Sequence, residues 1–508
     1  MLEDPQRDVF ALLSDPATYG NGIARVERID THISAVFLAG DRVYKLKRAV
    51  RLPFLDFSTL ERRHMACLAE LVVNRRTAPE LYIGLTAITR EDDGRLALGG
   101  EGQPVDWLVV MVRFDQDALM DRMAAAGQLT RAHATDLADA VVAFHAVAEP
   151  RPGWGGETGI RSTIDSNAVC FAQEIPGLFD AVEAGRVTEG SLAWLIRLAP
   201  LLEARRAAGQ VRLCHGDLHL GNICVLDGKP RLFDGIEFSD TFACIDVYYD
   251  LAFLLMDFRA RGLPDMASWV LNRYLEQSGD LDGLAALPLF LSLRAAIRAH
   301  VSAAMARVSD DAHHRAEGLA YLEMAGRYLE PPPPRLMAVG GLSGSGKSRL
   351  GRDLAPLVGA APGAVVLRTD VIRKRLMGVG SEIRLPPEGY SSEMSERTYA
   401  ALFEATERAL KTGHSVIADA VFANPVQRAG IEAVARRLGV PFDGMWLEAR
   451  PEVMRSRIAA RKRNASDATV AVLDQQLSLD LGDIGWLRVD SSEAKEMTFA
   501  NARKSLHL

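Results

Sequence analysis

The sequence predicts two regions of different fold class: an α+β region, in which a strand-rich part precedes a helix-rich part, and an α/β region with a parallel sheet. Three observations support this division. Polar and apolar residues alternate early in the chain as they do in strands, whereas apolar residues recur at helical spacing over residues 130–147. Four consecutive prolines, Pro331 to Pro334, then interrupt the chain. After them, strand-like and helix-like segments alternate, as in an α/β domain.

The proline run is the predicted domain boundary. Proline cannot continue a helix, and a run of prolines favours a stiff polyproline II spacer. We therefore expect domains at residues 1–330 and 335–508, joined by a linker at residues 331–334.

The composition excludes several classes of protein. Hydrophobic residues make up 48% of the chain and charged residues 25%, which excludes a disordered or collagen-like chain. The formal net charge of −7 disfavours, without excluding, a nucleic-acid partner. The N-terminus lacks the pattern of a signal peptide, and no run of about 18 apolar residues indicates a membrane span. With five scattered cysteines, we expect a cytoplasmic protein with reduced thiols and no membrane partner.

Near the N-terminus, the pattern indicates strands. Residues 33–38 and 42–46 flank Gly40-Asp41 and predict a β-hairpin. Ser58 precedes a helical stretch with Glu61 three residues later, the spacing of a capping box. Residues 107–112 predict a short apolar strand.

The last segment before the prolines, residues 289–328, has a largely helical pattern and carries Arg294, Arg298 and His300. These side chains could face an acidic ligand. A solvated basic helix face is the interpretation that we favour.

After the prolines, short apolar segments alternate with amphipathic ones. We expect strands at residues 336–339, 364–367, 414–418 and 445–447, and helices after Lys347 and at residues 395–410 and 426–438. This order predicts a parallel sheet with helices on both faces. Ligands bind such a sheet at the carboxyl ends of its strands.

Residues 341–348, GLSGSGKS, match the phosphate-loop pattern GxxxxGK[ST] between an apolar strand and a helix. Backbone N–H groups and the helix N-terminus would hold a phosphate there. Lys347 would reach the β- and γ-phosphates of a nucleotide, and the Ser348 hydroxyl would bind Mg²⁺. The predicted nucleotide-binding residues are Gly341, Gly344, Ser345, Gly346, Lys347 and Ser348.

Two carboxylates follow predicted strands of the same sheet. Asp419 resembles the acidic residue that helps to bind Mg²⁺ in P-loop proteins, and Ala420 stands where ATPases carry a water-activating glutamate. The region therefore favours transfer to an acceptor over hydrolysis. Asp370, at the end of another strand, could accept a proton from an acceptor hydroxyl, or it could be a helix N-cap.

Arg457 and Arg461 are four residues apart and share one face of a predicted helix. They could act catalytically by closing over the phosphates, or form a solvated basic surface. Together with the phosphate loop, the segments TDVIRK, VIADAVF and RIAARKRNASDA make residues 336–508 resemble the small-molecule and polynucleotide kinase-like P-loop group, near the gluconate kinases and zeta-toxin-type kinases.

A second constellation precedes the prolines. His215, Asp217 and Asn222 form the pattern HGDxxxxN, and a predicted hairpin then carries Asp234 back to the same end. Asn222 and Asp234 offer the oxygen ligands that Mg²⁺ prefers. Asp217 is the expected catalytic base, with His215 beside it, because a base that precedes a metal-binding asparagine by five residues is the layout of phosphoryl transfer.

These residues resemble the aminoglycoside phosphotransferase family, a branch of the protein-kinase-like fold with a strand-rich N-lobe and a helical C-lobe. The resemblance implies an ATP-anchoring lysine on a strand, Lys45 with Lys47 as the alternative. It also implies a partner glutamate in the next helix, for which Glu61 is the candidate unless it only caps that helix. Asp250, in the segment IDVYYDLA, would brace the catalytic loop or cap a helix.

The pairing of both regions resembles a bacterial two-domain family, the aminoglycoside phosphotransferase/ATP-binding proteins. The resemblance implies a kinase with two nucleotide sites that uses ATP and Mg²⁺ to phosphorylate a hydroxyl of a small-molecule or nucleotide-like acceptor. Two alternatives remain: a regulatory protein in which one domain senses ATP and controls the other, and a polynucleotide- or toxin-like kinase that acts through the C-terminal domain. The cysteine and histidine spacings do not favour a zinc site.

Overall fold

The computed structural model describes residues 5–52, 55–175, 177–309, 311–460 and 466–508. The chain forms two compact units, one of Met1–Ile160 with Ala199–Asp257 and one of Arg161–Leu198 with Phe258–Leu508. The proline run lies inside the second unit. The division into domains at residues 1–330 and 335–508 therefore stays a prediction.

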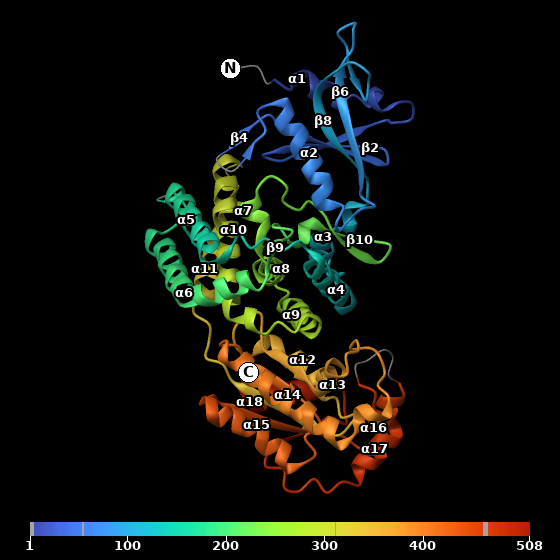
Figure 1. The fold of residues 1–508 in the computed structure, drawn as a ribbon, viewed down its shortest axis with the longest axis vertical. Coiled ribbons are helices and arrows are strands. Elements are labelled where there is room, and N and C mark those ends of the chain that lie inside the picture. The colour runs from blue at the N-terminus through green and yellow to red at the C-terminus, as the bar shows by residue number, and fades with distance from the viewer. Residues whose placement is uncertain (1–4, 53–54, 176, 310, 461–465) are drawn as a thin grey trace. The chain divides into compact units, whose positions relative to one another are not determined.

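The first unit opens with a six-stranded antiparallel sheet in the order β1-β2-β3-β8-β6-β7. In that order the strands are Val26–Asp30, Ser34–Ala39, Arg42–Lys47, Gln103–Val112, Tyr82–Arg90 and Leu96–Leu98. The predicted hairpin is confirmed as β2 and β3, and Gly40 takes the left-handed φ of 59° that their turn requires. Helix α2 (Leu60–Asn74) packs against β8 and β6 (Figure 1).

The predicted start of α2 is wrong by one residue. Thr59, not Ser58, is the N-cap, and its hydroxyl accepts a hydrogen bond from the backbone N–H of Arg62 at 3.3 Å. Glu61 therefore lies in the first turn as an exposed residue, where its charge favours the positive end of the helix dipole.

The rest of the first unit is mainly helical, with three short two-stranded pairs. Strands β10 and β11 form the predicted hairpin, and the turn residues Asp227 and Gly228 both have positive φ. Strand β12 pairs with β9. These elements are α1 (Arg7–Ser14), β4 (Arg51–Leu52), β5 (Leu55–Asp56), α3 (Met120–Ala125), α4 (Arg131–Val147), β9 (Val211–Leu213), β10 (Ile223–Leu226), β11 (Lys229–Leu232), α7 (Asp240–Ala243) and β12 (Cys244–Asp246).

Three helices contain the boundaries between the units: α5 (Gly156–Glu174), α6 (Ala181–Ala207) and α8 (Val247–Ala260). The second unit continues with α9 (Pro264–Ser278), α10 (Leu287–Ser309) and α11 (Ala312–Tyr328). The expectation of a solvated basic face on α10 is wrong. Arg294 is buried, Arg298 lies over the ring of Tyr321, and His300 is 3.2 Å from the side chain of Asn167, so these residues pack between helices.

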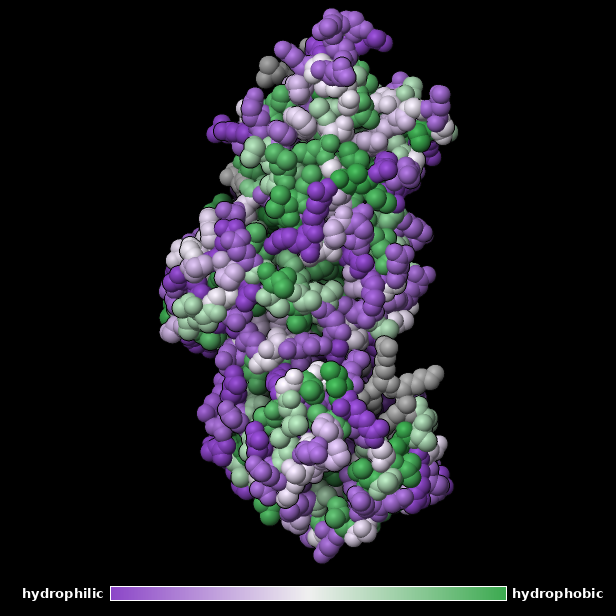
Figure 2. All heavy atoms as spheres, turned by 45° about the vertical axis from the view of Figure 1, so that its right-hand side comes forward, coloured by the Kyte–Doolittle hydropathy of each residue, from purple (hydrophilic) through white to green (hydrophobic). Residues whose placement is uncertain are grey.

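One helical stretch, Asp282–Ser309, is long and apolar enough to cross a membrane by length and composition alone, whereas no such span was expected from the sequence. However, 72% of its most apolar window is buried inside the protein, and α10 packs along α11. A core helix of a soluble protein meets the same criteria. Figure 2 shows hydrophilic residues over much of the face that it draws, with hydrophobic residues gathered in an area of its upper half and scattered elsewhere.

The region after the prolines is the predicted parallel sheet, with five strands in the order β14-β15-β13-β16-β17. In that order they are Val365–Arg368, Val416–Asp419, Leu336–Gly341, Phe442–Glu448 and Leu487–Asp490. The helices are α12 (Lys347–Leu354), α13 (Thr369–Leu376), α14 (Ser392–Lys411), α15 (Pro425–Leu438), α16 (Pro451–Ala459), α17 (Val470–Leu477) and α18 (Lys495–Leu506). Alternation predicted most of them, but β17, α17 and α18 were not anticipated.

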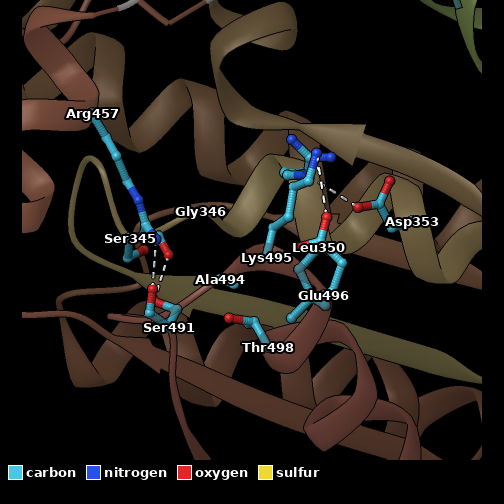
Figure 3. A pocket seen from close by; sticks show the side chains of 11 residues that line it. Ser345, Gly346, Leu350, Asp353, Arg457, Ser491, Ala494, Lys495, Glu496 and Thr498 are labelled. Carbon is cyan, nitrogen blue, oxygen red and sulfur yellow. Dashed lines mark hydrogen bonds and ion pairs between the residues drawn. The ribbon is translucent and has the colours of Figure 1, made fainter.

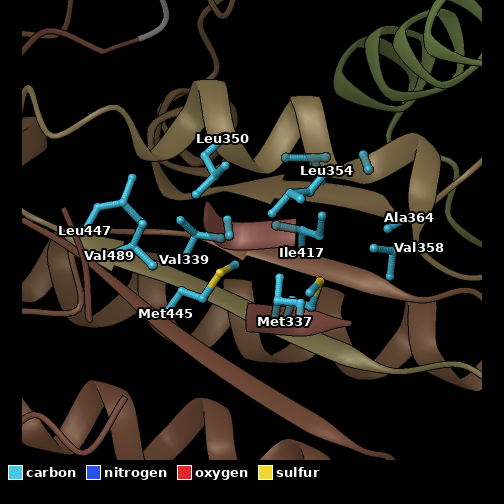
Figure 4. Packing of buried hydrophobic residues seen from close by; sticks show 14 residues of the cluster. Met337, Val339, Leu350, Leu354, Val358, Ala364, Ile417, Met445, Leu447 and Val489 are labelled. Carbon is cyan, nitrogen blue, oxygen red and sulfur yellow. The ribbon is translucent and has the colours of Figure 1, made fainter. Parts of the chain in front are cut away.

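The core of this sheet explains why its strands are apolar throughout. Met337 and Val339 of β13, Ile417 of β15 and Met445 of β16 meet Leu350 of α12 in one buried cluster (Figure 4). A parallel sheet that is covered on both faces has no polar side, so its strands read as continuous apolar runs. Because these strands are parallel, the ends of β13, β14 and β15 lie at one edge of the sheet, next to the phosphate loop.

Candidate active sites

In the first unit, two lysines of β3 share one buried glutamate. Lys45 Nζ lies 2.9 Å from Glu70 Oε1, and Lys47 Nζ lies 2.6 Å from Glu70 Oε2. Burial would lower the pKa of Lys45, but the carboxylates of Asp234 and Glu70 outweigh it, so the pKa lies well above its usual value and the ammonium group stays charged.

The glutamate that pairs with the lysines is Glu70, so the prediction of Glu61 is wrong. Glu70 follows Glu61 by nine residues, about two and a half helical turns, which places the two on opposite faces of α2. Glu70 belongs to the buried stripe that includes Cys67 and Leu71. An acidic residue inside an apolar stripe was the available signal, since a buried charge needs a partner.

The two lysines differ in how accessible their carboxylate partners are to a ligand. Lys47 is 1% exposed and also contacts Glu237 Oε1 at 2.5 Å, so both of its partners come from the protein interior. Lys45 contacts Asp234 Oδ1 at 2.5 Å, and the Asp234 side chain is 43% exposed. Lys45 is therefore the lysine beside a solvent-accessible carboxylate.

The catalytic-loop residues lie together as their spacing predicts. Asn222 Nδ2 donates to the backbone oxygen of Asp217 at 3.0 Å and to its carboxylate at 2.9 Å. The amide thereby orients the carboxylate of Asp217, which is 39% exposed and lies 3.4 Å from His219 Nε2. With its N–H groups directed at Asp217, the amide oxygen of Asn222 is the atom that a cation would meet.

Asp234 follows β11 in a strained backbone conformation. Its φ is 60°, in the left-handed region that L-residues seldom adopt. The backbone N–H of Asp234 donates to the Tyr82 hydroxyl at 3.1 Å, and that of Gly235 to Asn74 at 2.8 Å. Strain of this kind persists where the surroundings hold it, and such positions cluster at functional sites.

Asp250 braces the catalytic loop, as the resemblance implied. Its two carboxylate oxygens accept hydrogen bonds from the backbone N–H groups of His215 at 3.1 Å and Gly216 at 2.9 Å. Together with His145 and Cys214, Asp250 forms the one group among the described residues with metal-like spacing, but its oxygens are used by the loop. His215 is buried, which lowers the pKa of its imidazole, and Nε2 donates to the Phe233 carbonyl oxygen at 2.9 Å. A neutral His215 therefore supports the loop rather than facing a ligand.

In the second unit, the phosphate loop has the glycine conformations that the motif requires. Gly341, Gly344 and Gly346 have φ of 136°, 86° and 95°. A Cβ atom at Gly344 would lie 2.7 Å from the backbone oxygen of Met454, so only glycine fits there. Lys347 Nζ donates to the carbonyl of Leu342 at 3.0 Å, which bends the side chain back over the loop.

Ser345 and Ser348 offer hydroxyl groups at this loop. The Ser345 Oγ is buried and has no hydrogen-bond partner among the described residues. An orphaned buried hydroxyl costs free energy unless something completes its bonds, which fits a loop that receives phosphate oxygens. Ser348 is partly exposed in the first turn of α12.

The two predicted carboxylates lie at the carboxyl edge of the sheet. Asp419 ends β15, and Arg368 Nε approaches its Oδ2 at 3.3 Å. Asp370 lies in the first turn of α13, whose N-cap is Arg368, so the alternative of an Asp370 N-cap is wrong. Burial raises the pKa of Asp370, Asp419 acts in the same direction, and Arg368 and Lys347 act against them. All four charges therefore share one electrostatic neighbourhood.

Arg457 of α16 lines a cavity of about 500 Å³ beside Ser345 and Gly346 (Figure 3). Its guanidinium donates to the backbone oxygens of Ser491 at 2.7 Å and Glu493 at 3.2 Å, so here it is directed at the loop after β17. The other predicted lid arginine, Arg461, lies outside the described residues.

A polar cluster near Asp370 was not predicted from the sequence. Arg373 donates to the Gly389 oxygen at 2.9 Å. Asp467 accepts from the Tyr390 hydroxyl at 2.7 Å and lies 3.1 Å from Lys374 Nζ. Because these residues are far apart in the chain, no local spacing could have joined them.

Two protein-family models match separate parts of the chain. The model of the phosphotransferase enzyme family matches residues 79–287, and that of an AAA domain matches residues 336–479. Uncharacterized proteins of Mycobacterium tuberculosis and Mycobacterium bovis are each 30% identical over 489 residues, which cover 93% of this chain and 94% of the relative.

Two solved structures resemble separate parts of the chain. A choline/ethanolamine kinase family protein from Mesorhizobium loti is 13% identical, with a TM-score of 0.41, and the match covers 64% of this chain and 95% of that one. A gluconokinase from Sinorhizobium meliloti is 20% identical, with a TM-score of 0.25, and the match covers 34% of this chain and 96% of that one.

The two candidate sites and the two family matches lead to the same assignment. The first unit holds the catalytic loop of a phosphotransferase, and the second holds a phosphate loop on a parallel sheet. The chain belongs to the bacterial two-domain family that joins an aminoglycoside phosphotransferase-like domain to a P-loop kinase-like domain, and it is an ATP-dependent kinase.

Proposed function

We propose that the protein is a phosphotransferase with two nucleotide sites, each of which uses ATP and Mg²⁺ to transfer a γ-phosphate to a hydroxyl. The observation that carries the proposal is a contrast in exposure in the first unit. The carboxylates of Asp217 and Asp234 are 39% and 43% exposed, whereas Glu70, which pairs with Lys45 beside Asp234, is fully buried. Reactive groups that face solvent on a buried ionic support are what a ligand site requires.

At the first site, Asn222 and Asp234 would hold Mg²⁺ between the phosphates, and the ion would neutralise charge that develops in transfer. Lys45 would exchange part of its contact with Asp234 for an α- or β-phosphate oxygen. Asp217, oriented by Asn222, would accept the proton of the acceptor hydroxyl.

At the second site, the phosphate loop and Lys347 would hold the β- and γ-phosphates, and Ser348 and Asp419 would bind Mg²⁺. The cavity lined by Ser345, Gly346 and Arg457 has room for the nucleoside. Asp370 would be the base, and its raised pKa suits proton transfer better than that of an ordinary aspartate.

We propose a small-molecule or nucleotide-like acceptor in the cytoplasm. The polar cluster of Arg373, Tyr390 and Asp467 offers donors and acceptors that suit a polyhydroxylated or anionic compound. The net charge of −7 supports a small acceptor over a nucleic acid.

The test is transfer of labelled γ-phosphate from ATP to panels of sugars, nucleosides and RNA ends. The full chain is compared with Asp217→Asn, Lys347→Ala and the double variant. We expect each single variant to lose transfer to one class of acceptor and the double variant to lose both. Equal transfer by all four proteins would reject the proposal.

A further inference from the structure

Helix α9 of the second unit binds the open edge of the parallel sheet. Strand β14 is an edge strand, so the outer backbone groups of Ala364 and Val366 need partners. Asn272 of α9 supplies them: its Nδ2 donates to the Ala364 oxygen at 3.1 Å, and its Oδ1 accepts from the Val366 N–H at 2.7 Å. The amide thus replaces a neighbouring strand.

The same helix contributes a charge one turn later. Glu276 Oε1 lies 3.7 Å from Arg368 Nη1, and Arg368 Nε lies 3.3 Å from Asp419 Oδ2. Arg368 is only 4% exposed and is held between these two carboxylates. The residues form a chain of charges from α9 to the strand end where the second site would bind its cation.

We propose that Glu276 is a positioning residue of the P-loop site, which draws the guanidinium of Arg368 toward α9 and thereby leaves a carboxylate oxygen of Asp419 available to Mg²⁺. The inference rests on the proposed function of that site. Because α9 lies within residues 79–287, the phosphotransferase-family segment would tune the metal affinity of the other kinase domain.

The charges around this chain support the direction of the effect. Burial acts to lower the pKa of Arg368, but Asp419, Glu276 and Asp370 outweigh it, so the guanidinium stays charged. If Glu276 lost its charge, Asp419 would attract that guanidinium without competition from α9. A tighter pair with Arg368 would compete with Mg²⁺ for the same carboxylate.

Glu276 also faces other cations. Arg273 Nη1 lies 3.6 Å from its Oε2, and Arg375 donates to the backbone oxygens of Leu275 and Glu276 at 3.1 and 3.0 Å. These contacts anchor α9 at its C-terminal end, where basic groups favour the helix dipole. Since these contacts hold α9 and do not involve Asp419, a role of Glu276 in anchoring alone predicts no change in Mg²⁺ dependence, whereas the positioning role predicts one.

The experiment measures binding, not turnover, on the full chain. Affinity for a non-hydrolysable ATP analogue is titrated by calorimetry over a range of Mg²⁺ concentrations, and each variant is repeated with Lys347→Ala so that binding at the first site is subtracted. We expect Glu276→Gln to raise the Mg²⁺ concentration for half-maximal binding by about 3- to 30-fold. In an Arg368→Gln background, Glu276→Gln should have no further effect, because Arg368 transmits it.

Two matched controls separate charge from docking. Asp282→Asn removes the same charge from an exposed pair with Arg408, 3.0 Å apart, and should leave the Mg²⁺ dependence unchanged. Asn272→Ala should lower the melting temperature but not shift the Mg²⁺ dependence. An unaltered Glu276→Gln curve, or an equal shift in Asn272→Ala, overturns the inference. If the wild type shows no binding that depends on Lys347, the proposed function fails instead.

Discussion

The two sites assemble their charges in different ways. At the P-loop site, the main groups come from one continuous segment, 341–348, and from two strand ends beside it. At the first site, Lys45 meets Asp234 across 189 residues of chain and Glu70 across 25. A site made by local backbone geometry tolerates changes in its surroundings, whereas a site made of long-range buried ion pairs depends on every partner.

The largest effect should separate the two carboxylates of the first site. Asp217→Asn should reduce turnover there by about 10²- to 10⁴-fold while sparing Mg·ATP affinity, because it removes the general base and keeps the hydrogen bond from Asn222. Asp234→Asn should instead weaken Mg·ATP binding. Calorimetry and single-site transfer assays on the full chain measure both, and the reverse pattern would exchange the two roles.

The next largest effect concerns Glu70, the buried carboxylate that pairs with both lysines of β3. Glu70→Gln leaves two buried lysines, Lys45 and Lys47, with one carboxylate fewer, and should cost about 3–5 kcal/mol in the free energy of unfolding. Glu61→Gln on the opposite face of α2 is the matched control and should not move the unfolding midpoint. Chemical denaturation of both variants tests this. Equal midpoints would contradict the assignment of Glu70 as the support.

Lys347→Ala should affect the second site alone. Loss of the cation near the β- and γ-phosphates should cost about 3 kcal/mol in transition-state stabilisation, or a factor of about 10² to 10³ in rate. Stability should change little, because Lys347 lies partly exposed in the first turn of α12, outside the buried apolar cluster of the sheet. Transfer assays with acceptors specific to each site check this, and a rate loss at both sites would show that the sites are coupled.

The smallest effect is on acid stability of the second unit. Burial lowers the pKa of His300 and His414 to about 4, below the ordinary 6.5. Each neutral histidine therefore contributes stability that is fully present above pH 6.5 and is lost as the pH falls toward 4. At pH 5.5 the loss is about 1.4 kcal/mol for each histidine. His414→Gln should flatten the decline of stability with falling pH, and the exposed His32→Gln should not. Denaturation at pH 7.5 and 5.5 distinguishes them.

Local sequence patterns predicted those parts of the sites whose residues are brought together by a single turn, hairpin or loop. The phosphate loop, the loop from His215 to Asn222, and the hairpin that leads to Asp234 each bring their groups together within a few residues of turn, strand or helix. Alternation likewise predicted the parallel sheet, because strands covered on both faces must be apolar.

Only tertiary packing decided which charges are buried together. It chose Glu70 over Glu61, enclosed Lys47 with Glu237, and placed Arg294 inside the helical core. It also brought Glu276 of α9 to Arg368, although the sequence around neither residue predicts a contact with the other. The physical reason is that a buried charge is stable only beside a partner of opposite sign, and the fold selects that partner by distance in space, which sequence spacing does not encode.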